Sequence, residues 1–418
     1  MSALGLLAFV LLLLVLRQTL TVILIASIAY VHLVWGQGYL DYIVEDMWTS
    51  LNKELILSVP LFLLCGAVMT EGTAARRLVR IVRAMTVTTR GGLGVAAIIS
   101  CAVFAAISGS SIVTMIAVGS VLYPAMKEAG YTNRFALGTV VSGGTLGIII
   151  PPSIPLILYG LVTETSIVDL FLAGIFPGLL LILLMAAYAI WANRNQPAQK
   201  MDWVEMGTAL REGIWAALFP VILLGGIYSG YYSPTESAAV ALVYALFVEF
   251  FIHREMTLSK YFGVVTETAK LGGALFPLIA VALSLNLILT EYRVPAQMVE
   301  LVSMWIDSPL AFILIVNLLL LTVGAFMTTN EAILILGPIL MPVAQAYGFH
   351  PVHFGIIMIV NLEIGYLTPP VGMNLMVALV TFKQKFSELV ASVLPYIAIM
   401  IIGLIIITLV PWLSLGLL

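Results

Sequence analysis

The sequence predicts an all-α polytopic membrane protein with an inverted repeat, two re-entrant helical hairpins and two broken helices. Hydrophobic residues make up 62% of the 418 positions and charged residues only 9%, whereas soluble domains carry about 25% charge. Two apolar stretches, "GGTLGIIIPPSIP" (143–155) and "NLEIGYLTPPVGM" (361–373), are each interrupted by two consecutive prolines. Two further apolar stretches, 91–128 and 309–346, each contain a polar knot. The bilayer is therefore the expected solvent for most of this chain.

Composition also narrows the function classes. The net charge of −3 gives no indication of nucleic-acid binding, and we expect none. Cys65 and Cys101 lie in apolar runs, and neither they nor the four histidines have disulfide or metal-ligand spacing. The first sixteen residues have no basic start and are followed at once by a second apolar run. We interpret them as a membrane segment, with a cleaved signal peptide as the alternative.

A spanning helix needs about 20 apolar residues, and ten runs come close to this length or exceed it. The first is short and is followed by Arg17, so it is either a short span or the start of one long tilted helix. The expected spans are 3–16, 19–35, 55–71, 133–158, 166–192, 213–231, 235–252, 271–290, 350–381 and 388–413.

The stretches 91–128 and 309–346 are too long for single spans. The first has Ser108-Gly109-Ser110-Ser111 at its centre, and the second has Thr328-Thr329-Asn330-Glu331. We expect each to form a hairpin that enters the membrane and returns. Such a tip needs protein or a water-filled cavity around it, because its backbone groups require hydrogen-bond partners.

Basic residues predict the orientation. The segment 72–90 holds five arginines and is expected to be an amphipathic helix on the cytoplasmic surface. Counting spans from there places the basic clusters near 194–211, 253–260 and 383–385 on the same side.

The double prolines belong to an internal repeat. Pro151 and Pro369 stand 218 positions apart, and this offset aligns 119–152 with its counterpart without a gap. Six of the seven identities are glycine or proline, which determine backbone geometry. They are Gly119/Gly337, Leu122/Leu340, Pro124/Pro342, Gly130/Gly348, Gly147/Gly365, Pro151/Pro369 and Pro152/Pro370. Five expected spans separate the hairpins, and this odd number inverts the second copy. Inverted repeats with broken helices indicate a secondary transporter whose site lies at the membrane midplane.

The broken helices indicate the chemistry of that site. Prolines remove N–H donors, so carbonyl oxygens before them are free to bind a dehydrated Na⁺. We expect Ser110 and Ser111 to act with the carbonyls of 144–150, and Thr328, Thr329 and Asn330 with those of 365–368. Helix N-termini after the breaks suit an anionic substrate. The expected substrate contacts are Ser111, Thr329, Asn330, Ser153 and Asn374.

Buried ionisable and amide groups are further candidates. Glu363 and Glu331 lie near the second break and the second tip, whereas Glu236 in "SPTES" is interpreted mainly as a helix cap. Asn374 either faces a substrate cavity or forms an interhelical hydrogen bond.

Several motifs resemble the large membrane subunit of tripartite ATP-independent periplasmic (TRAP) transporters, the DctM-like family. They are "ISGSSIVTMIAVGSVLYPAMKEAGY", "GGTLGIIIPPSIPLILYG", "YYSPTESAAV", "GPILMPVAQAYGFHPVHFG" and "NLEIGYLTPPVG". The resemblance implies a Na⁺-coupled importer of organic acid anions in the bacterial or archaeal inner membrane. It also implies an elevator-type scaffold plus transport domain, a small four-helix membrane subunit and a periplasmic substrate-binding protein as partners.

Carried over by motif, the sodium sites pair each tip with the break of the same half, and two or more ions are expected. The implied ligands are Ser108, Gly109, Ser110, Gly147 and Ile150 in the first half, and Thr328, Asn330, Gly365 and Thr368 in the second. The family often has an acidic residue where Thr328 stands here. The resemblance therefore supports the second sodium site less strongly than the first.

The expected domains follow the same division. They are 1–71 (N-terminal scaffold helices), 72–90 (cytoplasmic arm), 91–165 (transport-domain half one, with its broken helix at 133–158), 166–290 (scaffold helices and a second arm), 291–385 (transport-domain half two, with its broken helix at 350–381) and 386–418 (C-terminal helix).

Two other function classes are weighed. A stand-alone divalent-anion/sodium symporter of the same superfamily would share the repeat but need no partner. A membrane enzyme is not favoured, because no Ser/His pair, paired aspartates or His-rich motif falls within the spans. The sequence contains no GxxxxGK[ST] phosphate-binding loop, so an ATP-driven pump is not favoured either. The sequence does not distinguish among carboxylates, sugar acids and sulfonates as the transported substrate.

Overall fold

The computed structural model describes residues 20–34, 41–198 and 200–418, together with a few isolated positions before residue 20. The expected span 3–16 and Arg17 therefore lie largely outside the described residues. All regular elements in the described part are helical, as the sequence predicts. Their bounds are α2 Leu20–Val34, α3 Asp41–Leu51, η1 Glu54–Leu57, α4 Ser58–Glu71, α5 Ala74–Thr86, α6 Gly92–Ser108, α7 Ser111–Glu128, α8 Asn133–Gly144, η2 Thr145–Ile148, α9 Ile154–Thr163, α10 Ile167–Ala192, α11 Trp203–Tyr228, α12 Pro234–Phe247, η3 Val248–Ile252, α13 Leu258–Glu291, α14 Val294–Ser303, α15 Pro309–Phe326, α16 Thr329–Ala346, α17 Pro351–Tyr366, α18 Met373–Phe382, α19 Phe386–Leu409 and α20 Trp412–Leu415.

Eight helices in the described part are long and apolar enough to cross a membrane. The spans expected at 55–71, 166–192 and 235–252 are confirmed within one or two residues. Two others begin earlier than expected. Helix α11 begins at Trp203 because the Asp202 side chain accepts hydrogen bonds from the first-turn backbone. Helix α13 begins at Leu258 in the same way, with Thr257 as its cap, so residues 258–270 continue directly into a span.

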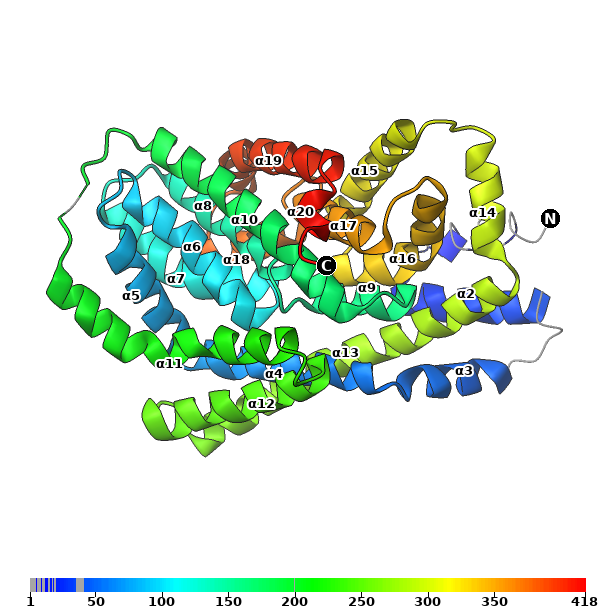
Figure 1. The fold of residues 1–418 in the computed structure, drawn as a ribbon, viewed down its shortest axis with the longest axis horizontal. Coiled ribbons are helices and arrows are strands. Elements are labelled where there is room, and N and C mark those ends of the chain that lie inside the picture. Colours follow the sequence, from blue (N-terminus) through cyan, green and yellow to red (C-terminus); the bar gives the residue numbers. More distant parts are fainter. Residues whose placement is uncertain are drawn as a thin grey trace.

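Two groups of helices lie side by side in Figure 1. Helices α4, α11, α12 and α13 run along one side of the molecule, and α2 and α3 pack on α13. The helices α6–α9 and α15–α19 form the other side, where α10 also lies. The two candidate hairpins and the two broken helices are therefore gathered in one part of the fold.

The arginine-rich segment forms the amphipathic helix α5, as predicted. Its apolar residues, among them Leu78 and Val82, are buried against α6 and α11. Arg80 forms ion pairs with Glu205 and Glu212 of the same helix α11, both at 2.7 Å. The arm is therefore anchored to α11 by both apolar packing and exposed charge pairs.

The repeat extends from the sequence to the structure. Shifting α7 by 218 positions gives the bounds of α16, and α6 and α9 fall on α15 and α18 within one residue. Gly130 and Gly348 occupy the turn after α7 and α16 with φ of +82° and +87°, a conformation that favours glycine. The halves also interlock, because α16 packs on α9 and α7 packs on α18.

Candidate functional site

The first tip is a tight turn between α6 and α7. Gly109 ends α6 with φ +57°, and Ser110 caps α7 by accepting a hydrogen bond from the Val113 N–H. The Ser108 hydroxyl lies 2.6 Å from the Thr114 hydroxyl. The knot of small polar residues therefore reverses the chain within two residues while keeping several oxygen atoms together at the tip.

The first break lies directly against this tip. Helix α8 tightens into η2 and ends before Pro151, and α9 restarts with Ser153 as its cap. A Cβ atom placed on Gly147 would lie 2.5 Å from the Ser110 carbonyl oxygen. Because Pro151 and Pro152 have no N–H, the carbonyls of Gly147 and Ile148 lack their α-helical donors. The first tip and the first break are therefore in close contact, and two carbonyls at the break have no α-helical donor.

The second tip has a different cap. Thr328 accepts from the Glu331 N–H, and the Glu331 carboxylate accepts from the Thr328 N–H, so the two form a capping box. Glu331 therefore stabilises the start of α16.

The second break contacts the end of α15 through backbone atoms and the second tip through the Tyr366 side chain. A Cβ atom on Gly365 would lie 2.6 Å from the Gly324 Cα at the end of α15. The Gly372 N–H donates to the Ala325 carbonyl at 3.1 Å, and the Thr329 N–H donates to the Tyr366 hydroxyl at 2.9 Å. Here the Gly365 carbonyl accepts from the Thr368 N–H at 2.9 Å, so it retains one lone pair for another partner.

Polar contacts also join the two halves. The Asn374 amide of α18 donates to the Ser111 hydroxyl of α7 at 2.6 Å, and both side chains are buried. The Thr329 hydroxyl donates to the Glu363 carboxylate of α17 at 3.2 Å. Asn374 therefore forms the interhelical hydrogen bond that was one of its two predicted roles.

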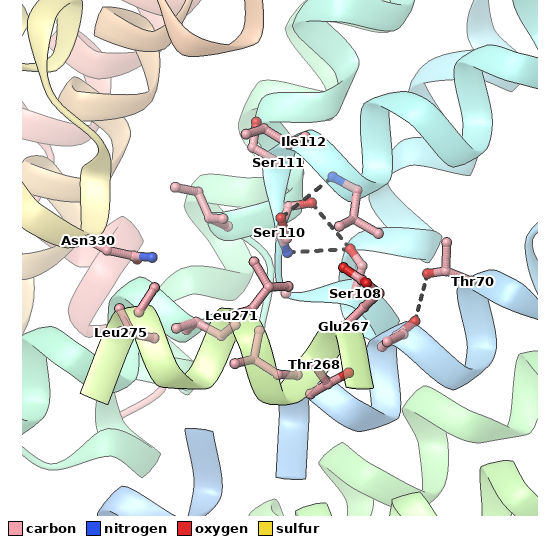
Figure 2. Close-up of a pocket in the computed structure, with 18 of the residues that line it drawn as sticks. Thr70, Ser108, Ser110, Ser111, Ile112, Glu267, Thr268, Leu271, Leu275 and Asn330 are labelled. Carbon is pink, nitrogen blue, oxygen red and sulfur yellow. Dashed lines mark hydrogen bonds between the residues drawn. The ribbon is translucent and has the colours of Figure 1, made fainter. Parts of the chain in front are cut away.

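Both tips line one large cavity of about 1190 Å³. Figure 2 shows Asn330 across this cavity from Ser108 and Ser110, with Leu271 and Leu275 of α13 along its wall. The end of α4, including Glu71, and the start of α13, including Lys260, complete the wall. The cavity thus lies between the two tips and the helices α4 and α13.

The sequence-predicted residues fall into two groups. Those that line the cavity are Ser108, Gly109, Ser110, Ser111, Thr328, Thr329 and Asn330. The others, in the breaks and in α18, lie behind the tips: Gly147, Ile150, Ser153, Gly365, Thr368 and Asn374. Ser153 is fully buried as a cap, and the Ile150 side chain packs at Gly178 of α10. The assignment of ion and substrate roles within these groups stays a prediction.

Sequence reasoning missed three contributors. Thr114 bonds to Ser108 and lies one turn after the tip, where a polar residue in an apolar helix was a usable signal. Tyr366 binds the second tip, and Gly324 permits the close approach of α15 to the second break. No group of three or more His, Cys, Asp or Glu side chains that could hold a metal occurs among the described residues.

Comparison with known proteins identifies the family. The model of the tripartite ATP-independent periplasmic transporter DctM component matches residues 7–413. The C4-dicarboxylate TRAP transporter large permease protein DctM of Pseudomonas aeruginosa is 44% identical over 365 residues, covering 87% of this chain and 86% of that one. The isethionate TRAP transporter permease protein DctMQ of Oleidesulfovibrio alaskensis is 39% identical, covering 90% of this chain and 60% of that protein.

A solved structure supports the fold. The YdaH transporter of Alcanivorax borkumensis superposes with a TM-score of 0.67 over 99% of this chain and 98% of that one, at 14% identity. Since the relatives in the family are named as transporter permeases, the expectation of a transporter rather than an enzyme is confirmed. This chain is a multi-pass membrane protein that belongs to the DctM family of TRAP transporter large permeases.

Proposed function

We propose that the chain is the large permease subunit of a binding-protein-dependent secondary transporter that imports an organic acid anion together with Na⁺. The observation that carries this proposal is the single cavity lined by both tips. The first tip contacts the first break at Gly147, and the end of α15, which leads into the second tip, contacts the second break at Gly365. Paired tips and breaks of this kind occur at the binding sites of transporters with inverted repeats.

Sodium is the proposed coupling ion and is transported as cargo. The first site combines the Ser108–Ser110 tip with the carbonyls of Gly147 and Ile150. The second combines Thr328 and Asn330 with the carbonyls of Gly365 and Thr368. These groups are oxygen donors, which a hard cation prefers. A bound cation would also satisfy the Gly147 carbonyl, which has no α-helical donor because residue 151 is a proline.

An organic acid anion is the proposed substrate. Ser111, Thr329 and Asn330 line the cavity, and the helix ends at the tips favour negative charge. The names of two relatives point to a dicarboxylate and to a sulfonate. The greater identity to the former favours a C4-dicarboxylate.

We further propose an elevator movement of the hairpins and broken helices against the scaffold helices. The close approach of the first tip to α4 supports this movement. A Cβ on Gly66 of α4 would lie 3.1 Å from the Ser108 backbone. Helix α4 therefore presents a glycine, without a protruding side chain, to the hairpin that would slide along it. The cavity reaches Glu71 and Lys260, next to the arginine-rich arm α5. The arm marks the cytoplasmic side, so this arrangement corresponds to an inward-facing state in the inner membrane.

The proposed partners are a small four-helix membrane subunit and a periplasmic substrate-binding protein. Family membership supports both. The named DctMQ relative is longer than this chain, which covers 60% of it, consistent with a permease that also includes sequence beyond the large subunit.

Reconstitution tests the proposal. Proteoliposomes containing this chain and the small subunit should take up radiolabelled succinate only with a Na⁺ gradient and the binding protein present. Vesicles with choline in place of Na⁺, and vesicles without the binding protein, serve as controls. Uptake that persists in both controls would refute the proposal. Uptake by this chain alone, driven by Na⁺, would instead support the stand-alone symporter.

A further inference from the structure

Glu363 is a buried carboxylate that the carbonyl-based sites leave unexplained. It lies in α17 with no exposed surface. Its Oε1 accepts from the Thr329 hydroxyl at 3.2 Å, and the Ser111 hydroxyl lies beside the carboxylate. Its Oε2 is buried and has no hydrogen-bond partner.

Among the described residues, no basic group forms an ion pair with this carboxylate. The ion pairs found among the described residues lie elsewhere, in the arm, in η3 with His253 and on exposed α13, and none includes Glu363. A buried anion whose charge is met only by two hydroxyl donors is strongly disfavoured. Such a carboxylate must be neutralised either by a proton or by a cation next to Oε2.

A second oxygen without a partner lies close by. Asn374 is fully buried, and its amide nitrogen donates to Ser111 at 2.6 Å. Its Oδ1 is buried and has no partner. Ser111 thus stands between Asn374 and Glu363, and each of these two side chains has one unsatisfied acceptor oxygen.

We propose that Glu363, Ser111, Thr329 and Asn374 form a further Na⁺ site, distinct from the carbonyl-based sites at the breaks. This inference rests on the proposed sodium coupling and adds a charge-compensated ion to it. The ligands are oxygen atoms from four helices, α7, α16, α17 and α18, as a hard cation prefers. Ser111 and Thr329 also line the cavity, so they provide the route by which the ion reaches the buried carboxylate.

Such an ion would couple the two halves of the repeat. Ser111 belongs to the first tip and Thr329 to the second, whereas Glu363 and Asn374 flank the second break. Binding would hold both tips on one ion. Release would leave the Glu363 charge uncompensated, so the ion-free arrangement of the tips would be disfavoured.

Na⁺-dependent thermal unfolding of the purified full-length chain tests this site directly, without any substrate. A ligand that binds only the folded state raises the midpoint by an amount that grows with the logarithm of its concentration divided by its Kd. Na⁺ is titrated against choline at constant ionic strength. For Glu363→Gln we expect a higher midpoint in choline, since a buried charge is removed, and an apparent Na⁺ affinity lower by about tenfold or more, equal to about 1.4 kcal/mol. Asn374→Ala should lower the Na⁺ affinity without raising the midpoint in choline.

Glu249→Gln is the matched control. Glu249 is also a buried carboxylate with an unpartnered Oε2, but it lies in η3 beside His253 at 3.1 Å. Its substitution should change the baseline midpoint and leave the Na⁺-induced shift intact. If Glu363→Gln does not fold, Glu363→Asp and Asn374→Ala carry the test, since both should weaken the Na⁺ response.

The outcomes separate this inference from the proposed function. A wild-type Na⁺ response that Glu363→Gln and Asn374→Ala leave unchanged would overturn the site and show that Glu363 carries a proton instead. The carbonyl-based sites would stand in that case. Wild-type protein with neither a Na⁺-induced shift nor Na⁺-driven uptake would overturn the proposed function itself. In uptake assays, the Hill coefficient for Na⁺ should fall by about one in Glu363→Gln.

Discussion

Replacement of Gly365 by alanine tests whether the end of α15 and the second break meet backbone to backbone. The added Cβ would lie 2.6 Å from both the carbonyl carbon and the Cα of Gly324, and ordinary contacts begin at 3.4 Å. The helices α15 and α17 would have to separate by roughly 0.8 Å. Overpacking of this kind costs about 1–3 kcal/mol, and no flexible side chain is present to absorb it.

The same displacement should weaken ion binding. It moves the Gly365 carbonyl, a proposed Na⁺ ligand, relative to the tip. We therefore expect Gly365→Ala to lower both the unfolding midpoint and the apparent Na⁺ affinity. The assay is thermal unfolding of the detergent-purified chain, with and without Na⁺.

Gly207→Ala is the matched control. Gly207 lies in α11, and a Cβ there would meet nothing within 4 Å. Alanine in such a helical position stabilises by about 0.5–1 kcal/mol. A Gly365→Ala protein that unfolds at or above the temperature of the Gly207→Ala protein, with a normal Na⁺ response, would refute the close packing of α15 and the second break.

Three further predictions concern other contacts. Ser111→Ala and Asn374→Ala should each destabilise by about 1–3 kcal/mol, because each leaves a buried polar group without its partner; the double variant should cost less than the sum, as a double-mutant cycle of unfolding measures. Arg80→Ala should change the unfolding midpoint little, and less still at high salt, because its ion pairs with α11 are exposed; a large loss would mean that the arm depends on them. His253→Leu should cost about 3–5 kcal/mol by isolating the buried Glu249, and adding Glu249→Gln should recover part of this loss; unfolding midpoints that fall further in the double variant would contradict the pairing.

Much of the fold follows from local chemistry that the sequence states directly. Proline lacks an N–H, so the breaks at Pro151 and Pro369 could be predicted from the two consecutive prolines at each position. Serine and threonine cap helices, so the polar knots predicted the turns at Ser110 and Thr328. The fixed offset of 218 then predicted that both halves repeat one arrangement, and α7 and α16 follow it.

The same local reasoning was less reliable where two signals compete. Charged residues in 203–212 and 258–270 suggested surface segments before the spans. The structure continues α11 and α13 through them, because caps at Asp202 and Thr257 begin the helices earlier. Charge is tolerated along exposed turns of a helix, so polarity alone does not end one.

The sequence by itself determined that the chain is a membrane protein. It also determined the positions at which its helices break and the residues that form the tips. Only the tertiary structure decided which groups meet across the halves. Asn374 reaches Ser111, 263 positions away, and Glu363 contacts the second tip while standing beside the first. The physical reason is that helices apolar on all sides carry no periodic signal of which face packs against which neighbour. Partner choice among them is made by close packing of the whole bundle.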